Sequence, residues 1–309
     1  MSKANKIVPL GEAVTAIKDG SSLTAGGFAH SHQPMGFVRE LIRQGPRDLT
    51  LMSVAECWVG EFLAAAGMLK RAYYSNFMFE GFGRCQQYSQ AVESGRLAVE
   101  DHSHFGMVCR LQAAGLGLPF MPMRAMAGTD ILDRPGFEPP QDKARRLKSP
   151  FGEEEVTAVS PLRPDVAVLH VARADRLGNA QLFGTTSVIE EQARAARTVI
   201  ITAEEIVETD VIRRDPERTI LPSFLVDAVV SLPYGAHPTG VYGYYEHDAE
   251  HLGTYYAASR DADATAAYLR RWVHGLPDHW AYLDAIGAST LLKLRVDPAL
   301  GYVLPEQHP

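Results

Sequence analysis

Residues 165–172 read Asp-Val-Ala-Val-Leu-His-Val-Ala. This run is apolar almost throughout, which is typical of a strand that is buried on both faces. Such strands occur in parallel sheets, because helices cover both sides of those sheets. The stretch therefore predicts an α/β fold built on a mostly parallel sheet.

Strand-like and helix-like patterns alternate on both sides of this stretch. Further strands are predicted at residues 22–25, 49–54, 71–77, 97–100, 120–125 and 198–203. Helices are predicted at residues 35–43, 58–67, 105–116 and 188–197, the third of them capped by Ser103. This alternation predicts a sheet with helices on both faces, which agrees with the prediction from residues 165–172.

One domain is expected over residues 1–290, followed by a C-terminal tail at 291–309. Residues 128–155, rich in proline and charge, are predicted to form an irregular excursion between two halves of the fold. From residue 247 to residue 294 the pattern is wholly helical. A chain of 309 residues is long enough to bury such a core.

Composition excludes several classes of protein. Apolar residues make up 46% and charged residues 22%, as in ordinary globular proteins, and the net charge of −7 argues against a nucleic-acid surface. No apolar run reaches the length of about 20 residues that spans a bilayer, so we expect no membrane partner and a cytoplasmic location. The three cysteines, Cys57, Cys85 and Cys109, are expected to be reduced and structural, although Cys57 could line a pocket.

Most of the common catalytic and metal-binding motifs are absent. The sequence holds no GxxxxGK[ST], GxGxxG, GxSxG or HExxH motif. It does contain two His-x-His pairs and one H-x-x-E-H pattern, formed by His30 and His32, His102 and His104, and His247, Glu250 and His251. Because no further anchored ligand accompanies them, these histidines are interpreted as polar groups of loops and of a solvated or interface helix, and no metal is expected.

The most informative local feature is residues 19–34, Asp-Gly-Ser-Ser-Leu-Thr-Ala-Gly-Gly-Phe-Ala-His-Ser-His-Gln-Pro. A turn leads into a strand that ends in two glycines and is followed by a helix. Paired glycines let backbone N–H groups approach a ligand closely, and the helix N-terminus favours negative charge. A carbonyl oxygen or a carboxylate would be favoured there.

This segment resembles the N-terminal signature of the family I coenzyme A transferases. Further stretches resemble the A subunits of the glutaconate CoA-transferase branch, among them QAVESGRLAVEDHSHFGM, PDVAVLHVARADRLGNAQ and GAHPTGVYGYYEHD. The similarity extends from about residue 19 to about residue 285. Two positions depart from the signature: Thr24 replaces an apolar residue, and His32 replaces the usual glycine.

The resemblance implies a fold like that of CoA-transferases and ribose-phosphate isomerases, and it implies a reaction. Members of this family move CoA between carboxylic acids through a glutamate nucleophile, which lies in a Ser-Glu-Asn-Gly segment of the B half. That segment is absent from this chain. The resemblance therefore implies an A subunit that works with a B subunit of similar fold, expected as two A and two B chains, with acyl-CoA and a carboxylic acid as substrates. CoA is expected as a substrate, without a permanently bound cofactor.

The resemblance also implies which residues form the wall of the active site. Gly26, Gly27 and Phe28 are expected to present backbone donors to the acyl oxygen or to a carboxylate. Six side chains at the ends of predicted strands are candidates for contacting the acyl group, since ligands of open α/β sheets bind there: His30, Ser75, Asn76, Glu80, Ser103 and His104. No catalytic nucleophile is expected in this chain.

Two alternatives remain open on the same fold. One is an acyl-CoA hydrolase of the ring-opening type found in steroid breakdown, or an acyl-CoA decarboxylase, because similarity to an A subunit does not by itself separate these reactions. The other is a non-enzymatic protein, either a ligand sensor or a scaffold. The absence of a basic surface and of a DNA-binding helix pair argues against the sensor.

Overall fold

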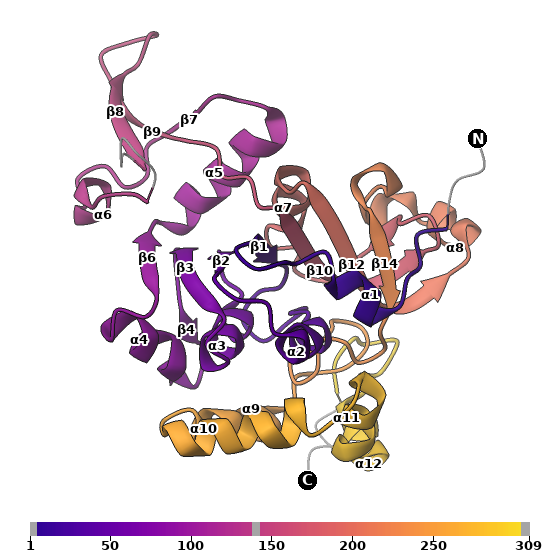
Figure 1. Cartoon of the computed structure of the whole chain (residues 1–309). Coiled ribbons are helices and arrows are strands. Elements are labelled where there is room, and N and C mark those ends of the chain that lie inside the picture. The colour runs from indigo at the N-terminus through magenta and orange to yellow at the C-terminus, as the bar shows by residue number, and fades with distance from the viewer. Residues whose placement is uncertain (1–4, 138–142, 304–309) are drawn as a thin grey trace.

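The computed structural model describes residues 5–137 and 143–303. Its centre is a nine-stranded sheet in which seven strands run parallel, and Figure 1 shows helices on both sides of it. In spatial order the parallel strands are β6 (Ala98–Asp101), β3 (Leu69–Tyr74), β2 (Leu49–Met52), β1 (Ser22–Ala25), β10 (Val166–Asp175), β12 (Thr198–Val207) and β14 (Ala228–Ser231). Two short strands extend the sheet: β11 (Ala180–Gln181) pairs antiparallel with β10, and β13 (Thr219–Leu221) pairs antiparallel with β11. The predicted fold class is confirmed.

Residues 165–172, the apolar run that predicted the fold, lie at the centre of the sheet, as predicted. Along β10, Val166 and Val168 pack into one core, whereas Ala167, Leu169 and Val171 pack into another on the opposite face. This alternation follows from the two-residue period of a strand. Every residue from Val166 to Ala172 is buried, which explains why the run is apolar on both faces.

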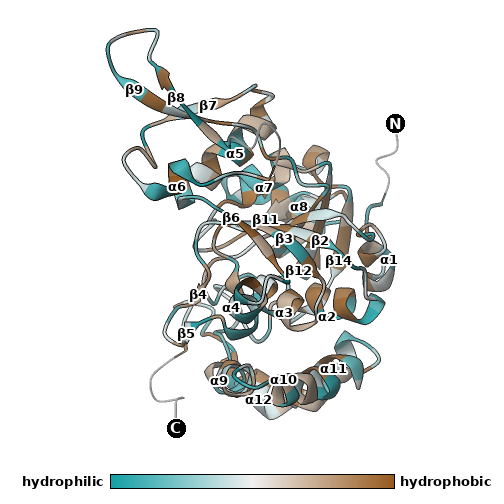
Figure 2. Ribbon diagram, turned by 60° about the vertical axis from the view of Figure 1, so that its left-hand side comes forward, coloured by the Kyte–Doolittle hydropathy of each residue, from teal (hydrophilic) through white to brown (hydrophobic). Residues whose placement is uncertain are grey.

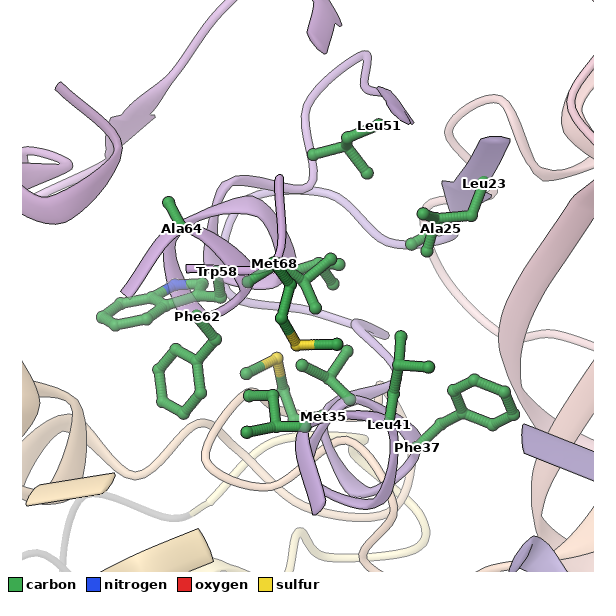
Figure 3. Packing of buried hydrophobic residues seen from close by; sticks show 14 of the residues in the cluster. Leu23, Ala25, Met35, Phe37, Leu41, Leu51, Trp58, Phe62, Ala64 and Met68 are labelled. Carbon is green, nitrogen blue, oxygen red and sulfur yellow. The ribbon is translucent and has the colours of Figure 1, made fainter. Parts of the chain in front are cut away.

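Helices cover the two faces unequally. One face carries α1 (Leu10–Val14), α2 (Met35–Gln44), α3 (Cys57–Ala65) and α4 (Gln86–Glu93). In Figure 3, Met35 of α2 lies close to Phe62 of α3 and to Met68. The other face carries α5 (His104–Leu116) and α7 (Ile189–Ala195). A short helix, α8 (Thr209–Arg214), follows β12.

The C-terminal region is helical, as predicted, and forms an additional layer outside α2 and α3 (Figures 1 and 2). It contains α9 (Ala249–Ala258), α10 (Ala262–Leu269), a π-helical turn (Arg270–His274), α11 (His279–Ile286) and α12 (Ala288–Leu294). Leu252, Tyr255 and Tyr268 from this layer join the core beneath it. The predicted boundary between residues 290 and 291 falls inside α12, and residues 304–309 of the predicted tail lie outside the described residues.

Two predictions about the middle of the chain are wrong. Residues 120–125 do not join the central sheet: β7 (Met121–Met123) pairs with β9 (Glu155–Val159), which pairs with β8 (Ala144–Lys148) in a separate antiparallel sheet. Consequently the stretch 128–155 is not irregular throughout, since it contains α6 (Asp130–Asp133) and β8; residues 138–142 lie outside the described residues. The charged sequence of β8 hid the strand, because most of its side chains are exposed on an arm that projects from the body (Figure 1).

Several short strands escaped the sequence analysis. They are β4 (Met78–Phe79), β5 (Gly83–Arg84), β11, β13 and β14, each of four residues or fewer. Such lengths give too little alternation to be recognised. Among the described residues, no helix is long and apolar enough to cross a lipid bilayer.

Candidate functional site

Four parallel strands, β1, β2, β3 and β6, end side by side, and most of the predicted site residues follow them directly. Gly26 follows β1, Ser75 follows β3, and His104 comes shortly after β6. The strands are parallel, so these residues gather at one edge of the sheet. The turn that follows β2, residues 53–56, lies between them and was not among the predicted site residues.

Of the three residues expected to present backbone donors, Gly26 and Phe28 already use their N–H groups within the protein. The N–H of Gly26 donates to the Val168 carbonyl oxygen at 2.8 Å, and the N–H of Phe28 donates to the Ser31 carbonyl oxygen at 3.0 Å. For Gly27 the structure gives no acceptor among the described residues. The donor role expected of all three residues therefore remains a prediction for Gly27 alone.

Gly27 also fits its loop for steric reasons. Its φ angle is +112°, and a Cβ atom there would lie 2.6 Å from the Gln33 Cγ and 2.8 Å from the Ser31 carbonyl oxygen. Other residues avoid this conformation and this spacing, so the position requires glycine. The tight turn inferred from the Gly-Gly sequence is thus present, and the close approach of a ligand to this backbone stays a prediction.

The two departures from the family signature have structural explanations. Thr24 is buried, and its hydroxyl donates to the Met52 carbonyl oxygen at 2.8 Å and accepts from the Gln192 amide at 2.9 Å. It therefore links β1, β2 and α7 with a polar group. His32 has a φ angle of +58°, a conformation that glycine adopts easily. Burial lowers the pKa of His32 to about 3, so its ring is neutral.

His30 and Glu80 are brought together, but not through the Glu80 side chain. The His30 Nδ1 accepts a hydrogen bond from the Trp58 indole at 2.8 Å, so its proton sits on Nε2, which donates to the Glu80 carbonyl oxygen. The Glu80 carboxylate is exposed in the turn between β4 and β5. The two ring nitrogens of His30 thus join the glycine loop to α3 and to the turn between β4 and β5.

Ser75 and His104 form a pair that faces outward. The Ser75 hydroxyl donates to the Val54 carbonyl oxygen at 2.8 Å, and its oxygen lies 2.6 Å from the His104 Nδ1. Because the single serine proton goes to Val54, Nδ1 must be the donor to Ser75. The His104 side chain is exposed, and its Nε2 has no hydrogen-bond partner among the described residues. This nitrogen is free to meet a substrate.

Two other predicted residues have different surroundings. Ser103 caps α5 as predicted, its hydroxyl oxygen accepting from the Gly106 N–H at 3.0 Å. Asn76 is half-buried, and the part of the chain that the structure describes offers its side chain no hydrogen bond. A substrate contact by either residue stays a prediction.

The sequence analysis missed Glu56, in the turn after β2. Its carboxylate is fully buried and accepts hydrogen bonds from the N–H groups of Val54 and Ala55, at 3.0 and 2.8 Å. Burial raises the pKa of Glu56 to about 7, although these N–H groups act in the opposite direction. Glu56 therefore holds the turn whose Val54 carbonyl binds Ser75. An acidic residue within the apolar run 54–60 was the available signal.

Cys57, considered as a pocket residue, instead lies in the core with 2% exposure.

The remaining histidine patterns are used inside the protein. His102 bonds the Glu100 carboxylate at 2.7 Å, and Arg110 bonds the same oxygen at 2.6 Å. Burial alone would raise the pKa of Glu100, but the His102 hydrogen bond and the Arg110 charge lower it to about 2. His251 bonds the Tyr268 hydroxyl at 2.8 Å. Across residues 5–137 and 143–303, no three His, Cys, Asp or Glu side chains gather closely enough to hold a metal ion.

Comparison with known families now identifies the chain. The model of the coenzyme A transferase family matches residues 9–232. The chain belongs to the coenzyme A transferase family. The A subunit of glutaconate CoA-transferase of Acidaminococcus fermentans is 34% identical over 96% of this chain and 97% of its own length. The crystal structure of glutaconate coenzyme A-transferase from the same organism matches with a TM-score of 0.93 at 32% identity, over 98% of this chain and 100% of the matched chain.

Other similar proteins include one that is uncharacterised and two whose names give a different reaction. An uncharacterised protein of Archaeoglobus fulgidus is 39% identical over 94% of this chain, which spans 65% of that relative's length. A crystal structure of the decarboxylase AibA/AibB matches with a TM-score of 0.75 at 36% identity, over 88% of this chain and 100% of the matched chain. The IpdA subunit of the cholesterol ring-cleaving hydrolase of Rhodococcus jostii is 28% identical over 91% of this chain and 96% of its own length. The expected resemblance to A subunits is confirmed.

Proposed function

We propose that this chain is the A subunit of a heteromeric CoA-transferase that moves CoA between carboxylic acids. It would act with a B subunit of similar fold, in an assembly of two A and two B chains. CoA would be a substrate, and the A chain would form one wall of the active site. The similarity to the A subunit of glutaconate CoA-transferase over nearly the full length of both chains supports this proposal.

The observation that carries the proposal is that this edge offers groups for binding substrate but no activated carboxylate. Among the described residues here, the Glu56 and Glu100 carboxylates are buried and already bonded to donors of the same chain. The Glu80 carboxylate is exposed to water on a hairpin turn. The nucleophile of a covalent mechanism must then come from another chain.

The proposed reaction proceeds by covalent exchange. The glutamate carboxylate of the partner attacks the thioester carbon of acyl-CoA, and the C–S bond breaks. The products are a mixed anhydride of the glutamate and the acyl group, and free CoA thiolate. The thiolate then attacks the glutamyl carbonyl, which releases the first acid and leaves a glutamyl-CoA thioester. A second carboxylic acid reverses these steps and leaves as the new acyl-CoA, giving ping-pong kinetics.

Within this scheme, Gly27 and His104 would be the groups of this chain that touch the acyl part. The Gly27 N–H would donate to the oxygen on which negative charge develops. The Nε2 of His104 would accept a hydrogen bond when the ring is neutral and donate to a carboxylate when it is protonated. Ser75 would hold the ring in place through Nδ1.

The test measures CoA transfer by the purified chain, alone and with a partner chain that contains the Ser-Glu-Asn-Gly segment. We expect activity only in the mixture. His104→Asn should lower kcat or raise the KM for the acceptor acid at least tenfold, with an unchanged melting temperature. His274→Asn, at an exposed histidine in the C-terminal layer, serves as the matched control.

Each alternative has a distinct outcome in the same assay. Release of free CoA without any acceptor acid would favour the hydrolase, and release of CO2 with the thioester intact would favour the decarboxylase. CoA transfer by the isolated chain at the rate of the mixture would overturn the proposal. Normal kinetics of His104→Asn with every accepted acid would remove His104 from the site.

A further inference from the structure

A large cavity lies at the other half of the same sheet edge. It has a volume of about 830 Å3 and opens at the ends of β10 and β12. Arg173 of β10, Glu204 and Glu205 of β12, residues 242–245, residues 295–296 and residues 298–301 are among the residues that line it. None of these residues was among the predicted site residues.

This cavity adjoins the glycine loop. The His32 N–H donates to the Gly240 carbonyl oxygen at 2.8 Å, and the Gly240 N–H donates to the His30 carbonyl oxygen at 2.8 Å. Two residues farther on, Tyr242 forms part of the cavity wall. A ligand in the cavity would therefore lie beside the loop that carries Gly27.

The first carboxylate of the cavity, Glu204, is bonded to four donors of the same chain. Its Oε1 accepts from the Tyr245 hydroxyl at 2.6 Å, the His170 Nε2 at 2.7 Å and the Gly235 N–H at 3.1 Å. Its Oε2 accepts from the Tyr234 N–H at 2.6 Å. Glu204 therefore keeps little acceptor capacity with which to attract a cation or a donor from a ligand.

The second carboxylate, Glu205, is also occupied. Its Oε2 accepts from the Tyr244 hydroxyl at 2.9 Å and lies 3.3 Å from the Arg173 Nε. Arg173 in turn donates to the Tyr244 oxygen at 3.1 Å. The charges of Arg173 and Glu205 therefore offset each other at the cavity wall.

Two arginines remain without such partners. Among the described residues, neither Arg218 nor Arg295 has an ion pair or a side-chain hydrogen bond, and both line the cavity. Each guanidinium carries five N–H donors and no acceptor. The free polar groups of the cavity are thus mainly cationic donors, which select an anion with several acceptor oxygens.

The apolar part of the wall is aromatic. The ring of Phe183 lies near the guanidinium groups of Arg173 and Arg218, at 5.2 and 5.4 Å from its centroid. Its plane is within 8° of that of Tyr244, and the two centroids are 6.4 Å apart. Parallel aromatic rings favour a flat, unsaturated ligand.

We propose that this cavity binds a flat organic anion, whose phosphate or carboxylate groups contact Arg218 and Arg295 while its plane packs on Phe183. Two kinds of molecule share this chemistry: the nucleotide end of CoA and a free aromatic or unsaturated carboxylic acid. The inference goes beyond the proposed reaction, because it is tested by binding alone and stands whether or not the assembled enzyme transfers CoA.

The experiment is calorimetric titration of the full chain with four probes. Adenosine 3′,5′-bisphosphate represents the nucleotide end of CoA, and terephthalate represents a flat dicarboxylic acid. Inorganic phosphate tests charge without a plane, and adenosine tests a plane without charge. Arg218→Gln and Arg295→Gln should each weaken binding of the flat anion about tenfold. Phe183→Leu should also weaken it, while keeping an apolar side chain.

Arg260→Gln is the matched control. Arg260 is likewise exposed and lies 4.9 Å from the centroid of an aromatic ring, that of Tyr256, but it does not line the cavity. Binding of the bisphosphate that is lost in the cavity variants and kept in Arg260→Gln supports the proposal and identifies the nucleotide. The same pattern with terephthalate alone supports the proposal and identifies a free acid.

Four outcomes would overturn the proposal. The first is no binding of either flat anion at millimolar concentration, and the second is binding that the cavity variants leave unchanged. The third is inorganic phosphate binding as tightly as the flat anions, which would indicate charge attraction alone. The fourth is an Arg295→Gln variant that binds the probes normally but no longer associates with the B subunit, which would make the cavity a protein interface.

Discussion

The two halves of the sheet's carboxyl edge are built from strands of different length, and they end differently. At β1, β2, β3 and β6 the strands have four to six residues, and the turns that follow fill the space with bonded side chains. On the other half, β10 and β12 have ten residues each, and the pairing of β10 with β1 extends no farther than Val168. The parts of β10 and β12 that extend beyond β1 enclose a cavity together with residues 242–245.

This difference determines which polar side chains remain available to ligands on each half of the edge. Glu56, Ser75 and Ser103 of the first half bond to the backbone of neighbouring turns, since each turn leaves backbone groups that need partners. On the second half one residue, Glu204, satisfies four donors at the base of the cavity. Among the described residues that line the cavity, two arginines are left free. The two free arginines lie outside the long strands, Arg218 in a 3-10 turn and Arg295 directly after α12, whereas Arg173 of β10 is bonded.

The largest effect is expected at Gly27. Gly27→Val should lower the free energy of unfolding by roughly 3–5 kcal/mol, because a side chain there meets Gln33 and the backbone of residue 31 in a left-handed conformation. Urea denaturation measures the loss. Gly67→Val is the control, since Gly67 also has positive φ, at +69°, but has open space around it. Equal losses at both positions would show that conformation, not the tight loop, sets the cost.

A smaller, pH-dependent effect is expected at Glu56. Its pKa is raised from 4.5 to about 7 by burial, so the folded protein holds this proton more tightly than the unfolded chain does. The stability contributed by that proton is complete below pH 4.5 and lost as the pH rises to about 7. Glu56→Gln has no such proton to lose. The variant's stability relative to wild type should therefore increase by about 3 kcal/mol between about pH 4.5 and about pH 8.

Denaturant unfolding at the two pH values tests this expectation. The exposed Glu93 provides the control, because Glu93→Gln removes an acidic group from the surface. A difference between wild type and Glu56→Gln that stays constant with pH would contradict the raised pKa of Glu56.

On the long-strand half, Glu204→Gln should cost about 2 kcal/mol of stability. The amide nitrogen that replaces one oxygen would face donors, either the Tyr234 N–H or the group bonded to Oε1. The neighbouring Glu205→Gln, at a half-exposed side chain, should cost less than about 1 kcal/mol. Thermal unfolding of both variants compares them, and equal shifts would show that the bonded network under the cavity is not special.

The smallest effect belongs to the helix cap on the short-strand half. Ser103→Ala should lower stability by about 1 kcal/mol, because the Gly106 N–H loses its acceptor at the start of α5. The melting temperature of the variant reports this loss. Ser103→Asp retains an acceptor and should restore most of the stability. If the aspartate fails to do so, the serine acts through something other than capping.

Much of this architecture could be predicted from local patterns in the sequence. The apolar run around β10 indicated a buried parallel strand, the Gly-Gly pair indicated a tight loop, and Ser103 indicated a cap, because each depends on neighbours along the chain. The family signature then indicated the A-subunit class, which the comparisons confirm. These features need no knowledge of distant contacts.

Tertiary structure decided what distant residues do to one another. Only the fold brings Trp58 to His30 and Val54 to Ser75, and such contacts determine which donors and acceptors remain free. The pKa of Glu56 depends on the absence of water around its carboxylate, which sequence spacing does not encode. The cavity likewise forms where β10 extends beyond the shorter β1 and residues 242–245 lie nearby. Its arginines are free to bind a ligand because the carboxylates beside them are bonded to other groups of the chain.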